Sequence, residues 1–126
     1  MKFKLSHEHR YWWPVTVAVP HPDKDKAGSF LEMSFRMQFE ALPREEALAL
    51  SKKLAGLEPA EAERHRYDDI VRVARDWDED VLDENDEPIP FSAARLAAFM
   101  ELSWFRLGVY RAWSSSLVGD AARKGN

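Results

Sequence analysis

Cysteine is absent from the 126-residue chain. Its absence excludes disulfides, thiolate metal sites and cysteine nucleophiles, and it fits a reducing compartment. The fold must therefore be held by packing, for which hydrophobic residues (45%) and aromatic residues (12%) supply the material. At this length we expect one core and a single domain over residues 1–126, with a frayed polar tail at residues 119–126.

Long apolar runs are also missing. No stretch approaches the roughly 18 consecutive apolar residues that a membrane span needs, and the first nine residues lack the apolar segment of a signal peptide. We therefore expect a protein of the bacterial cytoplasm with no membrane partner. Its 18 Lys and Arg residues are scattered among 22 Asp and Glu residues, with a net charge of −4. Because nucleic-acid binders usually carry a basic stripe, we expect no nucleic-acid partner.

Recognisable catalytic motifs are lacking as well. The chain has no Gly-x-Ser-x-Gly elbow, no phosphate-binding glycine loop and no His-Glu-x-x-His. Its five glycines are few for a cradle of backbone amides, and its carboxylates lie in charged runs rather than in an apolar setting that would perturb their pKa values. We expect no enzyme and no cofactor.

One acidic segment resembles a calcium-binding loop. Oxygen ligands fall at EF-hand spacing, at Asp76, Asp78, Asp80, Glu84 and Glu87. The position that requires glycine is occupied by Val81, and two following prolines, Pro88 and Pro90, block the exiting helix. The segment is therefore interpreted as a solvated turn, and a small metal-binding module remains an alternative.

The histidines offer a weaker metal signal. His7 and His9 would share one face of a strand, as zinc ligands sometimes do, but no third ligand has a fixed spacing to them. We interpret the pair as a surface cluster, and His65 as part of the solvated face of a helix.

Two segments alternate with the period of a β-strand. Odd positions are apolar from Tyr11 to Val19 and again from Leu31 to Phe39, and the turn-forming residues 20–29 between them predict a long exposed loop. These segments predict an antiparallel hairpin. Pro14 cannot donate a ladder hydrogen bond, so the first strand should lie at the edge of the sheet.

About four helices should cover this hairpin, which makes the fold class α+β. The first runs from Pro43 to a stop at Gly56, and the second starts near Pro59 and carries Tyr67, Ile70, Val71, Ala74 and Trp77 on one face. Ser92 should cap a third helix ending near Leu102, and Ser103 a fourth ending near Val118. Between the second and third helices, residues 81–89 predict a tight turn around Glu84, Asn85 and Asp86. Five side chains should be mostly buried in the core: Phe35, Phe39, Ile70, Trp77 and Phe91.

The predicted fourth helix, which starts at Ser103, carries a surplus of large apolar residues. A ladder of Phe105, Val109, Trp113 and Leu117 can serve the core, which leaves other side chains over. Two interpretations stay open, a helix buried on all sides and a helix with an exposed protein-binding patch. The candidate partner-binding residues are Trp104, Leu107, Tyr110 and Trp113.

The order of these parts resembles that of tail assembly chaperones from long-tailed, non-contractile phages or prophages. The resemblance rests on residues 12–20, then Phe35-Arg36-Met37-Gln38-Phe39 before a helix rich in Glu and Leu. It continues with Trp77, Val81 and Asp83-Glu84, then Pro88-Ile89-Pro90-Phe91-Ser92, Leu96 and a helical end with Tyr110. It covers roughly residues 10–118. Where this chain has Asn85-Asp86 the family pattern would have a glycine, and the spacing from Trp77 to Val81 is longer than in that pattern.

The resemblance implies a chaperone that coats the tape measure protein before the tail tube polymerises, helps to recruit tail tube protein and leaves the finished particle. It also implies a frameshifted longer form of the same protein, and a homo-oligomer is possible in such an assembly. The main alternative is a structural tail or head-to-tail component that stays in the particle.

Overall fold

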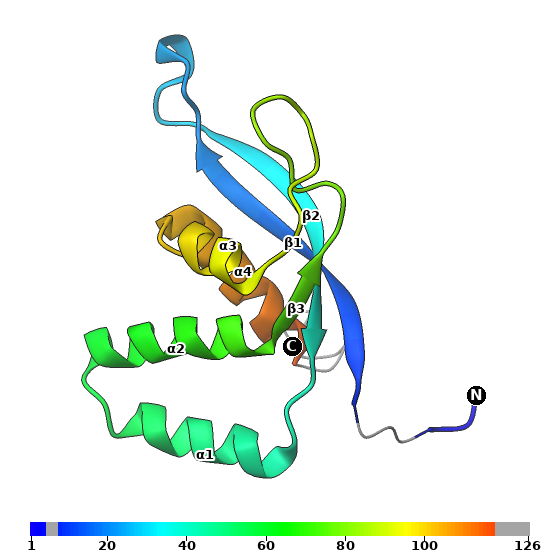
Figure 1. The fold of residues 1–126 in the computed structure, drawn as a ribbon. Helices are drawn as coiled ribbons and strands as arrows, with labels where there is room; N and C mark the ends of the chain where they lie inside the picture. Colours follow the sequence, from blue (N-terminus) through cyan, green and yellow to red (C-terminus); the bar gives the residue numbers. More distant parts are fainter. Residues whose placement is uncertain (5–7, 118–126) are drawn as a thin grey trace.

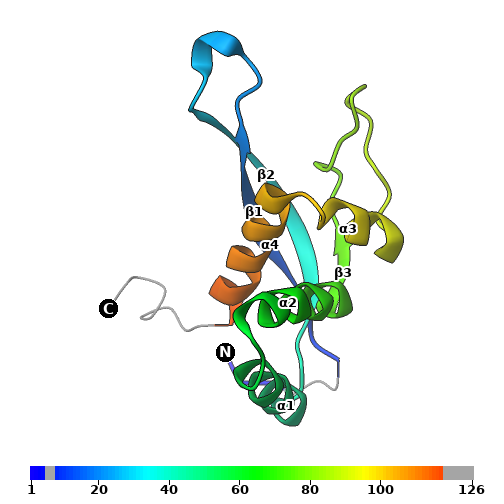
Figure 2. The ribbon, with the colours of Figure 1, turned by 90° about the vertical axis from the view of Figure 1, so that its left-hand side faces the viewer.

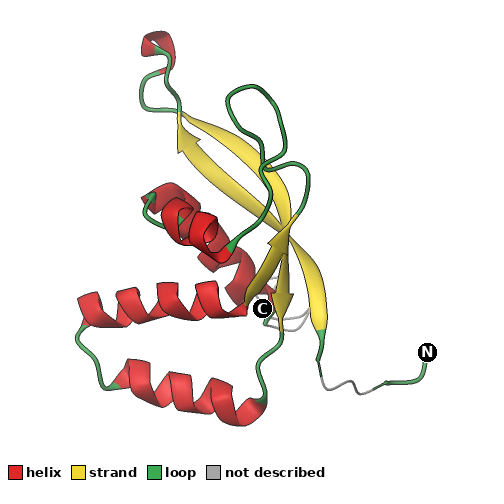
Figure 3. Ribbon diagram, in the orientation of Figure 1, coloured by secondary structure: helices red, strands yellow, loops and turns green. Residues whose placement is uncertain are grey.

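The computed structural model describes residues 1–4 and 8–117. The fold is α+β: strands β1 (Arg10–Pro20) and β2 (Phe30–Glu40) form a long hairpin, and four α-helices follow it in the chain. Figures 1 and 3 show the helices gathered on one side of the hairpin, whose tip extends beyond them. Three predicted features, His7, the helix end at Val118 and the frayed tail 119–126, lie outside the described residues.

The hairpin confirms the predicted alternation. β1 and β2 pair antiparallel in one unbroken register, from Arg10 opposite Glu40 to Pro20 opposite Phe30. The odd positions Val15 and Val17 of β1 are buried, as are the odd positions from Phe35 to Phe39 of β2, whereas Met33 is 51% exposed, and the even positions of β1 are exposed. The loop 21–29 contains a short 3-10 helix (Lys24–Lys26) and turns at Gly28, whose φ of 87° favours glycine. The sheet thus has one face on the core and one open face.

The hydrogen bonds at the two ends of the hairpin fix the direction of its backbone groups. The amide of His21 donates to the Ser29 carbonyl, and the amide of Ala41 donates to the His9 carbonyl. Bonded pairs recur at every second residue, so the backbone N–H and C=O groups of the odd-numbered residues of β1 and β2 bond to each other. The N–H and C=O groups of the even-numbered residues point away from the partner strand. Pro14 therefore lacks its N–H on the outer side of β1, where no ladder bond is lost, and β1 lies at the sheet edge as predicted.

A third strand corrects the prediction for residues 59–77. Helix α2 (Pro59–Val73) ends four residues before Trp77, and the remaining residues form β3 (Ala74–Trp77), which pairs antiparallel with the last part of β2. The apolar spacing suited a helix, but the even residues of β2 offer an open edge that an extended segment can pair with. The turn into a strand also inserts Trp77 into the core, where its indole N–H donates to the Ile89 carbonyl at 2.6 Å.

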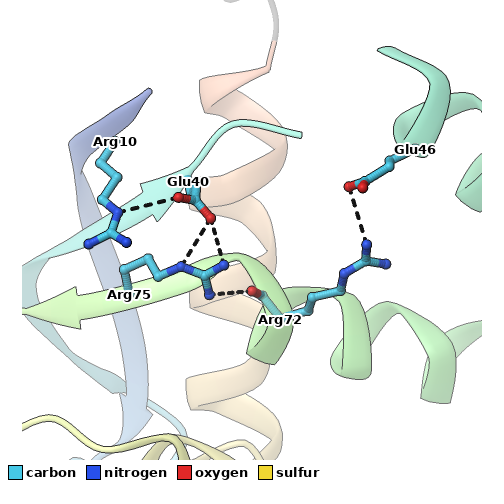
Figure 4. A network of polar contacts seen from close by, with 5 residues as sticks. All are labelled: Arg10, Glu40, Glu46, Arg72 and Arg75. Carbon is cyan, nitrogen blue, oxygen red and sulfur yellow. Dashed lines mark hydrogen bonds and ion pairs between the residues drawn. The ribbon is translucent and has the colours of Figure 1, made fainter. Parts of the chain in front are cut away.

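A network of charged side chains joins all three strands at one end of the sheet (Figure 4). The Glu40 carboxylate on central β2 accepts from Arg10 of β1 at 3.4 Å and from Arg75 of β3 at 2.6 Å. The Arg75 side chain also donates to the carbonyl of Arg72 at the end of α2. Glu40 therefore ties the edges of the sheet to its centre where α2 becomes β3.

The first two helices form an outer layer. α1 (Arg44–Ala55) begins next to Pro43 and ends before Gly56, as predicted. It packs mainly against α2, with an ion pair of 3.2 Å between Glu46 and Arg72. The expectation that this helix covers the hairpin is therefore wrong, because α4 (Ser103–Ser116) is the helix that packs along β1.

Of the two serines predicted to cap the last two helices, only Ser92 does so. α3 (Ala93–Phe99) begins after Ser92, whose hydroxyl accepts a hydrogen bond from the Arg95 amide at 3.1 Å. The helix is shorter than predicted. Ser103 is the first residue of α4 rather than its cap, and no side chain caps that helix. None of the helices among residues 1–4 and 8–117 is long and apolar enough to cross a membrane.

The core lies between the hairpin, α2, α3 and α4. Of the five predicted core residues, Phe35, Phe39, Ile70 and Trp77 are buried. Phe91 is partly buried, and its ring stands edge-on to that of Trp77 with centroids 5.0 Å apart. The ring of Phe99 contacts both Trp77 and Phe105, and the ring of Phe105 also stacks on Phe35. Aromatic side chains from five segments of the chain therefore meet in the core.

Candidate protein-binding groove

Gly108 sets the position of α4. A Cβ built on this residue would lie 2.7 Å from the carbonyl oxygen of Thr16 and 2.9 Å from a methyl group of Val17. Only glycine allows the helix to approach the backbone of β1 so closely. α4 thus covers the middle of the outer edge of β1, and the Tyr11 hydroxyl lies 2.8 Å from that of Ser116 near the end of the helix.

The sides of α4 differ in exposure. Phe105, Gly108, Val109 and Ala112 are buried, whereas Leu107 is 48% exposed. The helix is therefore not buried on all sides. The predicted core ladder is wrong at its end, because Leu117 is 61% exposed. The other three members of the ladder serve the core as predicted, since Phe105 and Val109 are buried and half-buried Trp113 packs against the core.

An apolar groove of about 830 Å³ runs between α4 and β1. One wall is a stripe on α4 that includes Trp104, Leu107 and Arg111 at helical spacing. The other wall follows β1 from Trp13 to Pro20 and reaches Phe30 at the start of β2. Figure 2 shows α4 lying in front of the hairpin along this line. The lining side chains come from the hairpin near the start of the sequence and from α4 near its end.

The structure divides the four candidate partner-binding residues into two pairs. Trp104 and Leu107 line the groove, with Trp104 half-buried. Tyr110 and Trp113 are half-buried and pack against the core, and neither is among the residues that line the groove. The division follows from the helical period, because residues 104, 107 and 111 lie on one side of α4, whereas residues 110 and 113 lie on another side.

Sequence reasoning missed the contribution of the hairpin to this groove. Trp13 and Phe30 belong to strands that we interpreted only as the core-forming part of the fold. The available signal was Gly108, because a single glycine within an apolar helix often marks the close approach of another backbone. Nothing in the sequence indicated which segment approaches it.

Two groups of opposite charge lie in the groove wall, Glu32 on β2 and Arg111 on α4. The rest of the lining is apolar or carries small hydroxyl groups. Such a surface suits apolar side chains of a partner, with the two charges able to fix its direction. An amphipathic helix offers side chains of this kind at a spacing of three and four residues.

The acidic turn forms as predicted, with Ile89 bonded to Val81 and a bridge between Leu82 and Pro88. The Asp83 carboxylate accepts from the amides of Asn85 and Glu87. Asp86 takes the left-handed backbone, φ 60°, that a glycine would otherwise occupy. In residues 1–4 and 8–117 no three His, Asp or Glu side chains converge as a metal would require.

Comparisons with known proteins add no family to this description: no family model, curated protein or solved structure matches the chain.

Proposed function

We propose that the protein is a tail assembly chaperone of a long-tailed, non-contractile phage or prophage. In this role it binds the tape measure protein before the tail tube polymerises, helps to recruit tail tube protein, and is absent from the mature particle. The order of sequence features described above supports the family. The groove between α4 and β1 supports the mode of binding.

The observation that carries the proposal is the exposure of apolar side chains inside the groove. Leu107 is 48% exposed and Phe30 is 62% exposed, and half-buried Trp13 and Trp104 line the same groove. A tape measure protein is a long helical chain, and its apolar faces self-associate unless another surface covers them. A groove of this size accepts a few side chains from one face of such a helix, so many copies would be needed along one chain.

Co-expression with the tape measure protein of the same genome tests the proposal. We expect the wild-type chain to raise the soluble fraction of that partner. Leu107→Asp should abolish the effect, because it places a charge among the apolar groups of the groove. Leu117→Asp is the matched control, since Leu117 lies at the end of the same helix, is 61% exposed and does not line the groove.

The results separate the candidates. If both aspartate variants fold and solubilise the partner equally well, the groove is not the binding surface. If the wild-type chain leaves the partner insoluble and instead appears in purified particles, the structural tail or head-to-tail component replaces the chaperone.

A further inference from the structure

β2 has an open edge that no other strand covers in the described part of the chain. β3 pairs only with residues from Met37 to Phe39, and the amide of Asp78 then donates to the Arg36 carbonyl. Beyond that point the chain leaves the sheet. The even-numbered residues Phe30, Glu32 and Ser34 point their backbone N–H and C=O groups to this side. Among the described residues, no backbone group of a strand or loop bonds to these N–H and C=O groups. Exposed donors and acceptors in a row are a template for a further strand.

The outer edge of β1 and the free edge of β2 differ in whether a further strand can add to them. On β1 the outward positions include Pro14 and Pro20, which have no N–H, and α4 covers Thr16. These features prevent a strand from adding there. On β2 the equivalent positions keep their amides, and both Phe30 and Met33 are more than half exposed. The open edge is therefore confined to residues 30–34 of β2.

The charge beside this edge selects the kind of strand that fits. Seven of the ten residues from 78 to 87 are acidic. Asp78 pairs with Arg36 at 2.9 Å, whereas no ion pair in the described residues neutralises Glu79 or Asp80. Glu79 lines the same hollow as Arg36 and Asp78, and the amide of Asp80 donates to the Asp78 carboxylate at 3.1 Å, so these acids lie near the end of the edge.

Pairing with a second copy of the chain is disfavoured by the same charges. An antiparallel pair of β2 edges that used all three outward residues would place Glu32 opposite Glu32 of the other copy. Like charges directly opposite destabilise a strand pair. Two acidic turns would also approach each other, which adds to the repulsion.

We propose that residues 30–34 of β2 bind an extended basic segment of another protein, which adds to the sheet as a fourth strand in line with β3. Lysine or arginine side chains at alternate positions lie on the open face opposite Glu32 and beside Glu79 and Asp80. Apolar side chains between them lie on the inner face beside Leu31 and Met33. This site shares the side chains of Phe30 and Glu32 with the groove, but it uses their outward backbone groups on the other edge of the hairpin, so it does not depend on the tape measure proposal.

A synthetic peptide that alternates lysine and valine is the probe. Added to the full chain, it should slow hydrogen exchange at the amides of Phe30, Glu32 and Ser34 and leave the outward amide of Ala18 on β1 unchanged. A peptide that alternates glutamate and valine should not bind. Absence of protection with the lysine peptide, or equal protection by both peptides, overturns the proposal.

Substitutions at Glu32 separate the backbone from the side chain. Glu32→Thr removes the carboxylate but keeps the backbone N–H, whereas Glu32→Pro removes both the carboxylate and an outward N–H that makes no bond to β1. We expect Glu32→Pro to bind the lysine peptide about fivefold more weakly than Glu32→Thr, the equivalent of one lost hydrogen bond. Equal binding by the two variants contradicts strand addition.

Two further measurements keep the test decisive if the proline variant does not fold. Glu32→Lys should lose binding of the lysine peptide and gain binding of the glutamate peptide, and no such reversal would count against the proposal. Sedimentation without peptide tests whether a second copy occupies the edge. We expect the wild-type chain to form no dimer through this edge, that is, no dimer that Glu32→Thr strengthens or that Glu32→Lys abolishes. A dimer formed through this edge would mean that the occupant is a second copy instead.

Discussion

Gly108 of α4 lies so close to Thr16 of β1 that a Cβ on the glycine would be 2.7 Å from the threonine carbonyl oxygen. Real Cβ atoms are not found at such distances from backbone atoms, so a side chain here must displace the helix or the strand. This one contact therefore fixes how α4 covers the edge of the sheet, and with it the width of the groove.

Gly108→Ala should destabilise the protein. Overpacking of a close contact costs about 1–3 kcal/mol, and the higher helix propensity of alanine recovers up to about 1 kcal/mol. Because the overlap involves a backbone atom, we expect the upper part of the overpacking range and a net loss of about 1–2 kcal/mol in the free energy of unfolding, measured by urea denaturation. Gly56→Ala is the control, because the nearest atom to its Cβ would be the Lys53 carbonyl oxygen at 3.8 Å. A Gly108→Ala variant as stable as wild type would show that α4 can move away from β1.

The two serines at helix starts should behave differently. Ser92→Ala removes a hydroxyl that accepts from the Arg95 amide, and loss of such a cap costs about 1 kcal/mol. Ser103→Ala should have little effect, since Ser103 lies inside α4 and caps nothing. Thermal melts of the two variants make the comparison. A larger loss for Ser103→Ala would mean that α4 begins one residue later than described.

The sequence predicted the hairpin well because alternation of period two is a local signal. From Val15 to Val17 and from Phe35 to Phe39, the odd side chains are buried as expected. β3 was missed because its four residues are too few to show a period of their own, and Ala74 and Trp77 also continue the apolar stripe of α2. Strand pairing depends on the open edge of β2, which the local sequence does not reveal.

The candidate site was predicted in part for a similar reason. The surplus of apolar residues on α4 indicated that some are exposed, and Leu107 is. Which of them line a groove depends on the rotation of α4 about its axis, which Gly108 sets through a contact 92 residues away in sequence. The sequence therefore could not show that this rotation places Tyr110 and Trp113 outside the groove.

Calcium should not change the stability of the protein. Asp78 is already paired with Arg36, and the Asp83 carboxylate is occupied by two backbone amides. A metal would have to break these bonds and draw together side chains that do not converge. Millimolar calcium should therefore leave the melting temperature unchanged. A rise of several degrees would support the metal-binding module, because a ligand at 100 times its dissociation constant adds about 2.7 kcal/mol.

Glu40 should make stability depend on pH. Its pKa is lowered from the ordinary 4.5, first by the hydrogen bond from Arg75 and also by Arg10, which outweigh the opposing effect of desolvation. Since the folded-state pKa is below the unfolded-state value, the unfolded chain binds the proton first as pH falls. The stabilisation is therefore complete above the unfolded-state pKa and disappears as pH falls through the folded-state pKa.

Glu40→Gln should accordingly lower the free energy of unfolding at neutral pH, and the difference from wild type should shrink as the pH falls below 4.5. Urea denaturation at a series of pH values measures this difference. Asp69, whose pKa burial raises, acts in the opposite direction, but it is present in both proteins and cancels. Glu32→Gln, at a carboxylate without an ion pair in the described residues, controls for the loss of charge alone. A difference that stayed constant with pH would show that Glu40 acts through packing and not through its charge.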